Sequence, residues 1–102
     1  MKTASRVRNR RHRCYELANG IMLEEPGADK FKLVHGIIHG WVGHAWIEVP
    51  GDQVYDPVRN TYTLRRVYAI TKQAVVEKRY TKKQAARAML KHHHHGPWHT
   101  ER

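Results

Sequence analysis

The sequence has few of the residues that would place it in several large classes of protein. Only one cysteine, Cys14, occurs in 102 residues, which excludes an intrachain disulfide and a zinc module built on several cysteines. No apolar run approaches the roughly 20 residues that a membrane-spanning helix needs. Acidic residues number nine against 19 lysines and arginines. The length allows one small domain, and a net charge of +10 is large for it.

The basic residues are concentrated towards the two ends of the chain. Residues 1–13 contain six bases and no acid, and residues 59–91 contain ten bases and one acid, whereas residues 14–58 contain seven acids and two bases. We expect residues 1–11 to form a basic arm and residues 12–91 a single folded domain. Residues 92–102 begin with four histidines, and we expect a loose tail outside the functional site. No apolar leader follows the basic start, which predicts a cytoplasmic protein.

The hydrophobic pattern predicts an α+β domain with an antiparallel sheet. Helical spacing begins at Cys14 and continues to about Leu23, before the turn signal Pro26-Gly27. Alternating patterns predict strands over 31–39, 44–49 and 53–56, and residues 74–80 fit either a fourth strand or a helical turn. A second helix is expected over 82–92, with Thr81 and Gln84 as a capping box. The pattern over 59–72 predicts no particular element. The expected fold is therefore an N-terminal helix carrying the cysteine, packed on three or four strands, and a C-terminal helix.

Cys14 stands where its helix should begin, which is a favourable place for a reactive thiol. The unpaired N–H groups and the positive end of the helix dipole stabilise a thiolate there. Arg11, His12 and Arg13 add positive charge nearby. A single cysteine on an apolar helix face is also compatible with a small core residue.

His44 begins one predicted strand and Asp56 ends the next, twelve residues later. If the connecting loop is odd and centred on Pro50, the two residues lie opposite each other with Cβ atoms about 5 Å apart. The carboxylate would then bind one imidazole nitrogen and leave the other for the thiol. A two-residue turn would instead pair Asp56 with Ile47, roughly 10 Å away along the strand. An odd loop with Gly51 in a left-handed conformation suits the sequence better.

These residues carry a resemblance to a known group of proteins. Gly43-His44-Ala45-Trp46-Ile47-Glu48-Val49, followed by Val54-Tyr55-Asp56-Pro57, resembles the histidine and aspartate strands of transglutaminase-like proteins. With Cys14-Tyr15 at a helix start and Val34-His35-Gly36-Ile37 between, the chain also resembles a group of small phage and bacterial proteins. The order Cys, His, Asp is that of the papain-like superfamily, which includes transglutaminases, cell-wall peptidases and arylamine acetyltransferases. The resemblance covers residues 12–58.

The resemblance implies a papain-like core and a cysteine hydrolase or acyltransferase acting on a protein or peptide amide, without a cofactor. Cys14 would be the nucleophile, His44 the general base and acid, and Asp56 the residue that orients the histidine. Papain-like peptidases have a glutamine upstream of the cysteine to bind the oxyanion, and this chain has none there. Asn9 or His12 are the candidates to replace it. Trp46 is expected to pack beside the triad, and Glu48 to be a solvated strand residue. If the chain is phage-encoded, its location would be the host cytoplasm.

Two other functions deserve comparison. His35, His39 and His44 suggest zinc, but the tetrahedral sites known in proteins need tighter clusters, so we predict no metal site. The basic ends instead suggest a non-enzymatic protein that binds nucleic acid or an acidic protein, although no nucleic-acid-binding motif is present. Its candidate contacts are Arg6, Arg8, Arg10, Arg11, Arg13, Lys82, Lys83 and Arg87. Nothing in the sequence predicts membrane contact or an oligomeric state.

Overall fold

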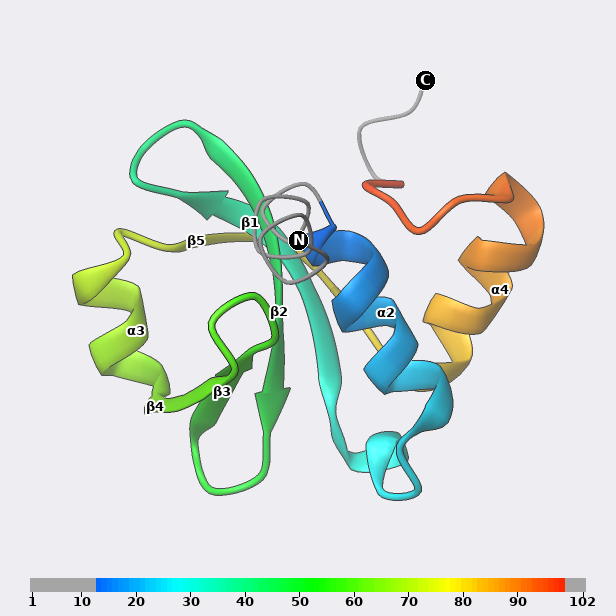
Figure 1. Cartoon of the computed structure of the whole chain (residues 1–102), viewed down its shortest axis with the longest axis horizontal. Helices are drawn as coiled ribbons and strands as arrows, with labels where there is room; N and C mark the ends of the chain where they lie inside the picture. Colours follow the sequence, from blue (N-terminus) through cyan, green and yellow to red (C-terminus); the bar gives the residue numbers. More distant parts are fainter. Residues whose placement is uncertain (1–12, 99–102) are drawn as a thin grey trace, which may run out of the picture.

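The computed structural model describes residues 13–98 and contains three α-helices, a short 3-10 helix and five strands within that range (Figure 1). The elements are α2 (Cys14–Glu24), η1 (Ala28–Lys30), β1 (Lys32–Ile38), β2 (Val42–Val49), β3 (Gln53–Asp56), β4 (Thr61–Leu64), α3 (Arg65–Thr71), β5 (Val75–Tyr80) and α4 (Lys82–His92). The predicted α+β class and the packing of the cysteine-bearing helix on the sheet are confirmed. The sheet has five strands rather than the expected three or four.

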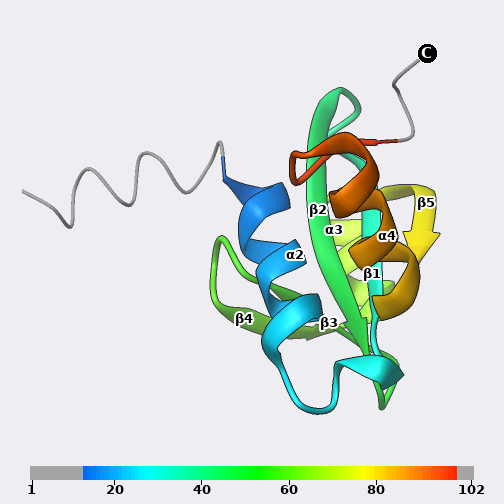
Figure 2. The ribbon, with the colours of Figure 1, turned by 90° about the vertical axis from the view of Figure 1, so that its right-hand side faces the viewer.

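All strand pairs are antiparallel, in the order β4-β3-β2-β1-β5. Helices α2 and α4 cover one face of the sheet, and α3 lies on the other (Figures 1 and 2). Two separate clusters of buried side chains follow from this arrangement. One includes Ala18, Leu33 and Ile47 beneath α2 and α4, and the other includes Val34 and Trp46 on the α3 side.

Local signals explain where the two longer helices begin and end. α4 starts with the predicted capping box, in which Thr81 Oγ1 accepts from the N–H of Gln84 and the Gln84 side chain accepts from the N–H of Thr81. α2 ends at Glu24, where the backbone becomes extended at Glu25 before Pro26. No helix among the described residues is long and apolar enough to cross a membrane.

The segment for which the sequence predicted no element forms β4 and α3. α3 has seven residues and one buried side chain, that of Tyr68, and no side chain caps its start. A helix with so few buried residues gives little hydrophobic periodicity to detect. Of the two alternatives for residues 74–80, the strand is correct, and β5 lies at the edge of the sheet beside β1.

The β2–β3 hairpin has the predicted odd loop, but its centre differs from the expected one. The observed register leaves a three-residue loop, 50–52, whose middle residue Gly51 has the predicted positive φ, 90°. The loop is therefore centred one residue after Pro50. Continuing this register by one residue places Asp56 opposite Trp46, so His44 is a diagonal neighbour of Asp56 on the same face. Diagonal neighbours are about 7–8 Å apart, which side chains of this length can bridge.

The histidine-rich segment does not form the expected loose tail up to residue 98. Trp98 is 4% exposed and belongs to the core beneath α2 and α4. Its indole Nε1 donates to the carbonyl oxygen of His94 at 2.7 Å. Asn19, buried in α2, places its amide nitrogen 3.3 Å from His95 Nδ1. The prediction failed because one tryptophan outweighs the polar residues around it, since burying an aromatic ring removes a large apolar area from water.

Candidate active site

Cys14 is the first residue of α2 and is almost completely buried, at 3% exposure. Arg13 precedes it, and no described side chain caps the helix, so the first backbone N–H groups have no acceptor from a capping residue. The positive end of the helix dipole therefore acts directly on the thiol. Arg13 itself donates two hydrogen bonds to Glu16, at 2.9 and 3.0 Å, so its charge is paired on the surface rather than turned to the sulfur.

His44 and Asp56 form the central contact of the site. His44 lies near the start of β2, and Asp56 is the last residue of β3. His44 Nε2 donates to Asp56 Oδ2 at 3.1 Å, and both side chains are buried. This bond leaves Nδ1 as the second ring nitrogen, and the Cys14 side chain is among the groups that raise the pKa of His44. The structure thus brings together the three residues that the sequence singled out.

The Asp56 carboxylate is held by three donors. Oδ2 accepts from the Tyr68 hydroxyl at 2.7 Å as well as from His44, and Oδ1 accepts from the backbone N–H of Val58 at 3.0 Å. Three donors fix the carboxylate in one orientation, and that orientation sets the position of the imidazole ring. The N–H of Val58 comes from the turn that follows β3, so the Asp-Pro sequence positions the carboxylate and its donor together.

The electrostatics of the pair favour its charged form. Burial lowers the pKa of His44, but the hydrogen bond to Asp56, the Cys14 side chain and the negative charges of both outweigh burial and raise it to about 9. Burial also raises the pKa of Asp56, and its bonds with His44, Tyr68 and Val58 bring it below the usual value. At neutral pH the imidazole is therefore protonated, and it places a cation beside the Cys14 side chain.

Tyr68 is the participant that the sequence analysis missed. It lies in α3, is 3% exposed, and packs its ring against Trp46 with centroids 5.4 Å apart. Burial raises the pKa of its phenol far above the usual range, and the nearby charge of Asp56 adds to this. Tyr68 therefore remains a neutral donor to the carboxylate. A tyrosine twelve residues after Asp56 gave no recognisable signal, because the helix that orients it was not predicted.

The three residues open onto a shared cleft. Its volume is about 550 Å³, and Cys14, His44 and Asp56 all contribute to its lining. The remaining walls come from the β1–β2 turn and the residues beside it, the loop after β3, Tyr15, and Lys72 at the end of α3. Burial and the charge of Cys14 raise the pKa of Tyr15 to about 12, so this wall stays uncharged. A buried thiol that nevertheless reaches an open cleft can meet a substrate while most of its surface is shielded from water.

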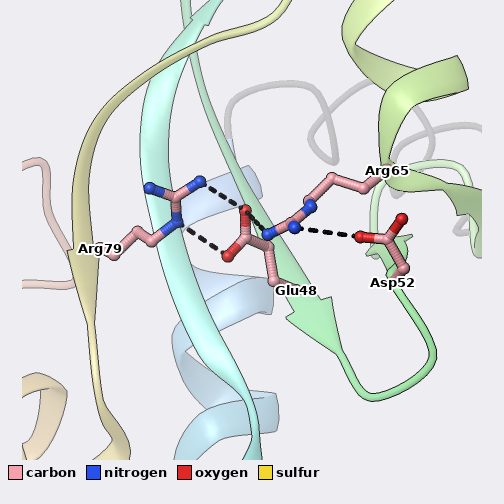
Figure 3. Close-up of polar contacts among 4 residues, drawn as sticks. All are labelled: Glu48, Asp52, Arg65 and Arg79. Atoms are coloured by element: carbon pink, nitrogen blue, oxygen red, sulfur yellow. Dashed lines mark hydrogen bonds and ion pairs between the residues drawn. The ribbon is translucent and has the colours of Figure 1, made fainter.

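Trp46 and Glu48 share the strand face of His44. The Trp46 ring is buried, and its centroid lies 6.1 Å from that of the His44 ring, so it packs beneath the histidine. The prediction for Glu48 was wrong, because its carboxylate is buried and forms ion pairs with Arg79 at 2.8 Å and Arg65 at 3.5 Å (Figure 3). Arg65 also pairs with Asp52 at 3.0 Å. Glu48 is therefore tied to β5 and α3 rather than solvated.

The other candidate residues do not converge on this site. His35 lies beneath α2 on the opposite face of the sheet from His44, and His39 is in the turn after β1 with φ 55°. Among residues 13–98, no three His, Cys, Asp or Glu side chains are arranged to hold a metal ion. Lys83 and Arg87 are exposed on α4 and do not line the cleft. Asn9 and His12 lie outside the described residues, as do the remaining candidate contacts of the arm, Arg6, Arg8, Arg10 and Arg11.

No family model matches the chain, and comparisons with curated proteins and with solved structures also found no match. The chemistry of the site must therefore be inferred from the side chains themselves. They combine a thiol at a helix N-terminus, an imidazole in contact with a carboxylate, and a neutral tyrosine that holds the carboxylate.

Proposed function

We propose that this protein is a cysteine-dependent acyl-transfer enzyme of the papain-like or transglutaminase-like type. Cys14 is its nucleophile, His44 its general base and acid, and Asp56 the residue that orients His44. The observation that supports the proposal is the buried bond from His44 to Asp56, 3.1 Å long, beside a cysteine that begins a helix and shares their cleft. Its substrate is a protein or peptide amide, and the reaction is hydrolysis, deamidation or transfer to an amine.

The reaction begins with a proton on His44 and a negative charge on Cys14 Sγ. The sulfur attacks the carbonyl carbon of the amide and forms a C–S bond, and the C–N bond breaks as the imidazolium gives its proton to the leaving amine. A thioester remains on Cys14. Neutral His44 then takes a proton from water or an acceptor amine, which attacks the thioester and releases Sγ as thiolate.

The negative charge that develops on the carbonyl oxygen also needs donors. The backbone N–H of Cys14 suits this role, because it stands in the first turn of α2 and has no partner within the helix. The dipole of α2 adds favourable charge at the same point. The side chains considered for the second donor, Asn9 and His12, stay predictions.

The proposal can be tested without a known substrate by measuring how fast Cys14 reacts with iodoacetamide. At pH 6.5 a thiol with the usual pKa of about 8.5 is only about 1% thiolate, so a cysteine paired with an imidazolium reacts up to about 100-fold faster than glutathione. His44→Asn should remove most of this advantage. The matched control is His93→Asn, because His93 is exposed and its left-handed conformation tolerates asparagine.

An alkylation rate no higher than that of glutathione would contradict the proposal. Equal rates in His44→Asn and in the unsubstituted protein would contradict it as well, since they would mean that the histidine does not activate the sulfur. Urea midpoints of both variants show whether each remains folded under the conditions of the assay.

A second candidate function is nucleic-acid binding through α4. Lys83 and Arg87 are exposed on this helix, and neither forms an ion pair within residues 13–98. Unpaired cations can bind phosphates, and such binding weakens steeply with salt. Fluorescence anisotropy of a labelled single-stranded oligonucleotide at low salt, with and without Lys83→Gln/Arg87→Gln, tests this function. No binding at low salt would exclude it.

A further inference from the structure

The cleft around Cys14 has an unbalanced charge. Apart from the triad residues, its lining includes Arg59 and Lys72 and contains no second carboxylate. The one acidic side chain in the lining, Asp56, already accepts from His44 and Tyr68. The cleft therefore presents positive charge to a ligand without an acidic group to balance it.

Three of the six arginines within residues 13–98 are paired with carboxylates. Arg13, Arg65 and Arg79 each pair with a carboxylate at 3.0 Å or less. Arg59 and Lys72 have no such partner within residues 13–98, although both lie beside the site. Cations left without partners at the mouth of a cleft are available to an anionic ligand, and a cleft concentrates their field.

The two cations come from different segments of the chain. Arg59 follows β3, close to the carboxylate end of the triad, and its charge acts on Tyr68. Lys72 ends α3, and its carbonyl oxygen accepts from the N–H of His39 at 2.8 Å, which ties it to the β1–β2 turn. Both side chains line the cleft onto which Cys14 opens.

The β1–β2 turn adds an apolar contact. Trp41 lines the cleft and is 81% exposed, the most exposed of the large hydrophobic residues described. Two other residues of this turn have positive φ, His39 at 55° and Gly40 at 85°. Trp46 and Trp98, by contrast, are buried. An indole presented at the mouth of a cleft is a typical anchor for a side chain of a bound peptide.

We propose that the substrate of this site is an acidic peptide segment, which places its carboxylates against Arg59 and Lys72 and an apolar side chain against Trp41. This inference rests on the proposed function, because it assigns the substrate class of the same cysteine. It makes Arg59, Lys72 and Trp41 the residues that determine specificity. The reacting amide lies between these contacts, at the sulfur.

Two alkylating agents test whether the cleft around Cys14 prefers an anionic ligand. Iodoacetate and iodoacetamide react in the same way, forming an Sγ–C bond as iodide leaves, but only iodoacetate is anionic. The ratio of their rates therefore reports the field at Cys14 independently of its general reactivity. Removing a charge close to the sulfur should lower this ratio about twofold, so Arg59→Gln/Lys72→Gln should lower it about fourfold at low ionic strength. The matched control is Lys30→Gln/Lys32→Gln, which removes two exposed cations at the opposite end of β1.

The outcomes separate the two proposals. A ratio that falls in Arg59→Gln/Lys72→Gln, stays unchanged in the control and loses its difference in high salt is the expected result. A reactive Cys14 with the same ratio in all proteins overturns the acidic substrate and leaves the enzyme proposal standing. A Cys14 that is inert to both agents overturns the two together.

Peptide protection tests the second half of the inference. A peptide with glutamates on both sides of a leucine should slow alkylation of Cys14 by iodoacetamide at a concentration at least fivefold lower than its glutamine counterpart. Trp41→Ala should weaken this protection severalfold and leave the iodoacetate-to-iodoacetamide ratio unchanged. Equal protection by the two peptides, or by oligothymidylate of the same charge, would overturn an acidic peptide as substrate. Unchanged protection in Trp41→Ala would overturn the apolar contact.

Discussion

Two buried carboxylates on one face of the sheet have opposite kinds of partner. Glu48 on β2 is held by the guanidinium groups of Arg79 and Arg65 (Figure 3). Asp56 on β3 is held by an imidazole, a phenol and a backbone N–H. Arginine stays charged at every accessible pH, so the partners of Glu48 do not exchange protons. An imidazole can gain and lose a proton, so the Asp56 cluster can transfer one.

The difference separates the cluster that holds secondary-structure elements together from the cluster that can transfer a proton. The Glu48 cluster joins β2, β5 and α3, and a fixed ion pair serves that purpose. The Asp56 cluster touches a thiol and a cleft, and proton transfer requires partners whose charge can change. Along β2, Trp46 lies between His44 and Glu48 on the same strand face.

The largest effect should come from removing the charge of Asp56. Asp56→Asn keeps the shape of the side chain but no longer stabilises a protonated imidazole, so iodoacetamide alkylation of Cys14 at pH 6.5 should slow by up to about 100-fold. Glu48→Gln is the matched substitution in the other cluster and should change the rate less than about twofold. Similar losses in both variants would contradict the distinction between the clusters.

Stability should respond in the reverse way. Glu48→Gln leaves Arg65 and Arg79 without a full negative charge, and both arginine side chains are about half exposed, at 51% and 46%. We expect the free energy of unfolding to fall by about 2 kcal/mol, because the buried bonds to charged groups are weakened while water partly compensates. Urea titration measures this change. A loss below about 0.5 kcal/mol would mean that the cluster does not hold β5 and α3 in place.

The pH dependence of stability should belong to the Asp56 cluster. The pKa of His44 is raised in the folded state, so the stability that it contributes is fully present below about 6.5 and is lost as pH rises towards its folded value. Cys14→Ser isolates this effect because its side chain does not titrate, and it retains Asp56 as the partner. In Cys14→Ser we expect the free energy of unfolding to fall by about 1 kcal/mol between pH 6.5 and 9. The fall should vanish in Cys14→Ser/His44→Gln, and its persistence there would assign it to another group.

The smallest effect should come from Tyr68. Tyr68→Phe removes one of three donors to Asp56, so alkylation at pH 6.5 should slow about threefold. The acid limb of the rate profile should also move to higher pH, because the carboxylate loses a bond that lowers its pKa. Tyr62→Phe, a substitution at an exposed tyrosine, is the control. An unshifted acid limb would show that Tyr68 only fills space.

Much of the site could be predicted because its residues belong to elements with strong local signals. Cys14 begins an amphipathic helix, and His44 and Asp56 lie on alternating strands joined by a loop of recognisable composition. The one-residue error in the hairpin centre did not separate His44 from Asp56, because both residues stay on one face when the register changes by two.

The rest depends on contacts between distant parts of the chain. The partners of Glu48 are 17 and 31 residues away, on an unpredicted helix and on an edge strand, so a strand pattern alone suggested a solvated side chain. Tyr68 was missed for the same reason. Trp98 was hidden by its neighbours, since the polar composition of the histidine-rich segment outweighed one aromatic residue in the sequence pattern.

Because Trp98 is packed in the core, the run of four histidines cannot be treated as a removable affinity tag. Such a run resembles an affinity tag, and cleaving it away after His92 would be routine practice. Here the cut would remove an indole that packs edge-on against Tyr80, with ring centroids 5.0 Å apart, and the contact of His95 with the helix that carries Cys14. Losing a buried tryptophan costs about 3–5 kcal/mol, a large part of the stability of a domain this small. The shortened protein would lack part of its core, so a loss of its activity would not be evidence for a role of the histidines.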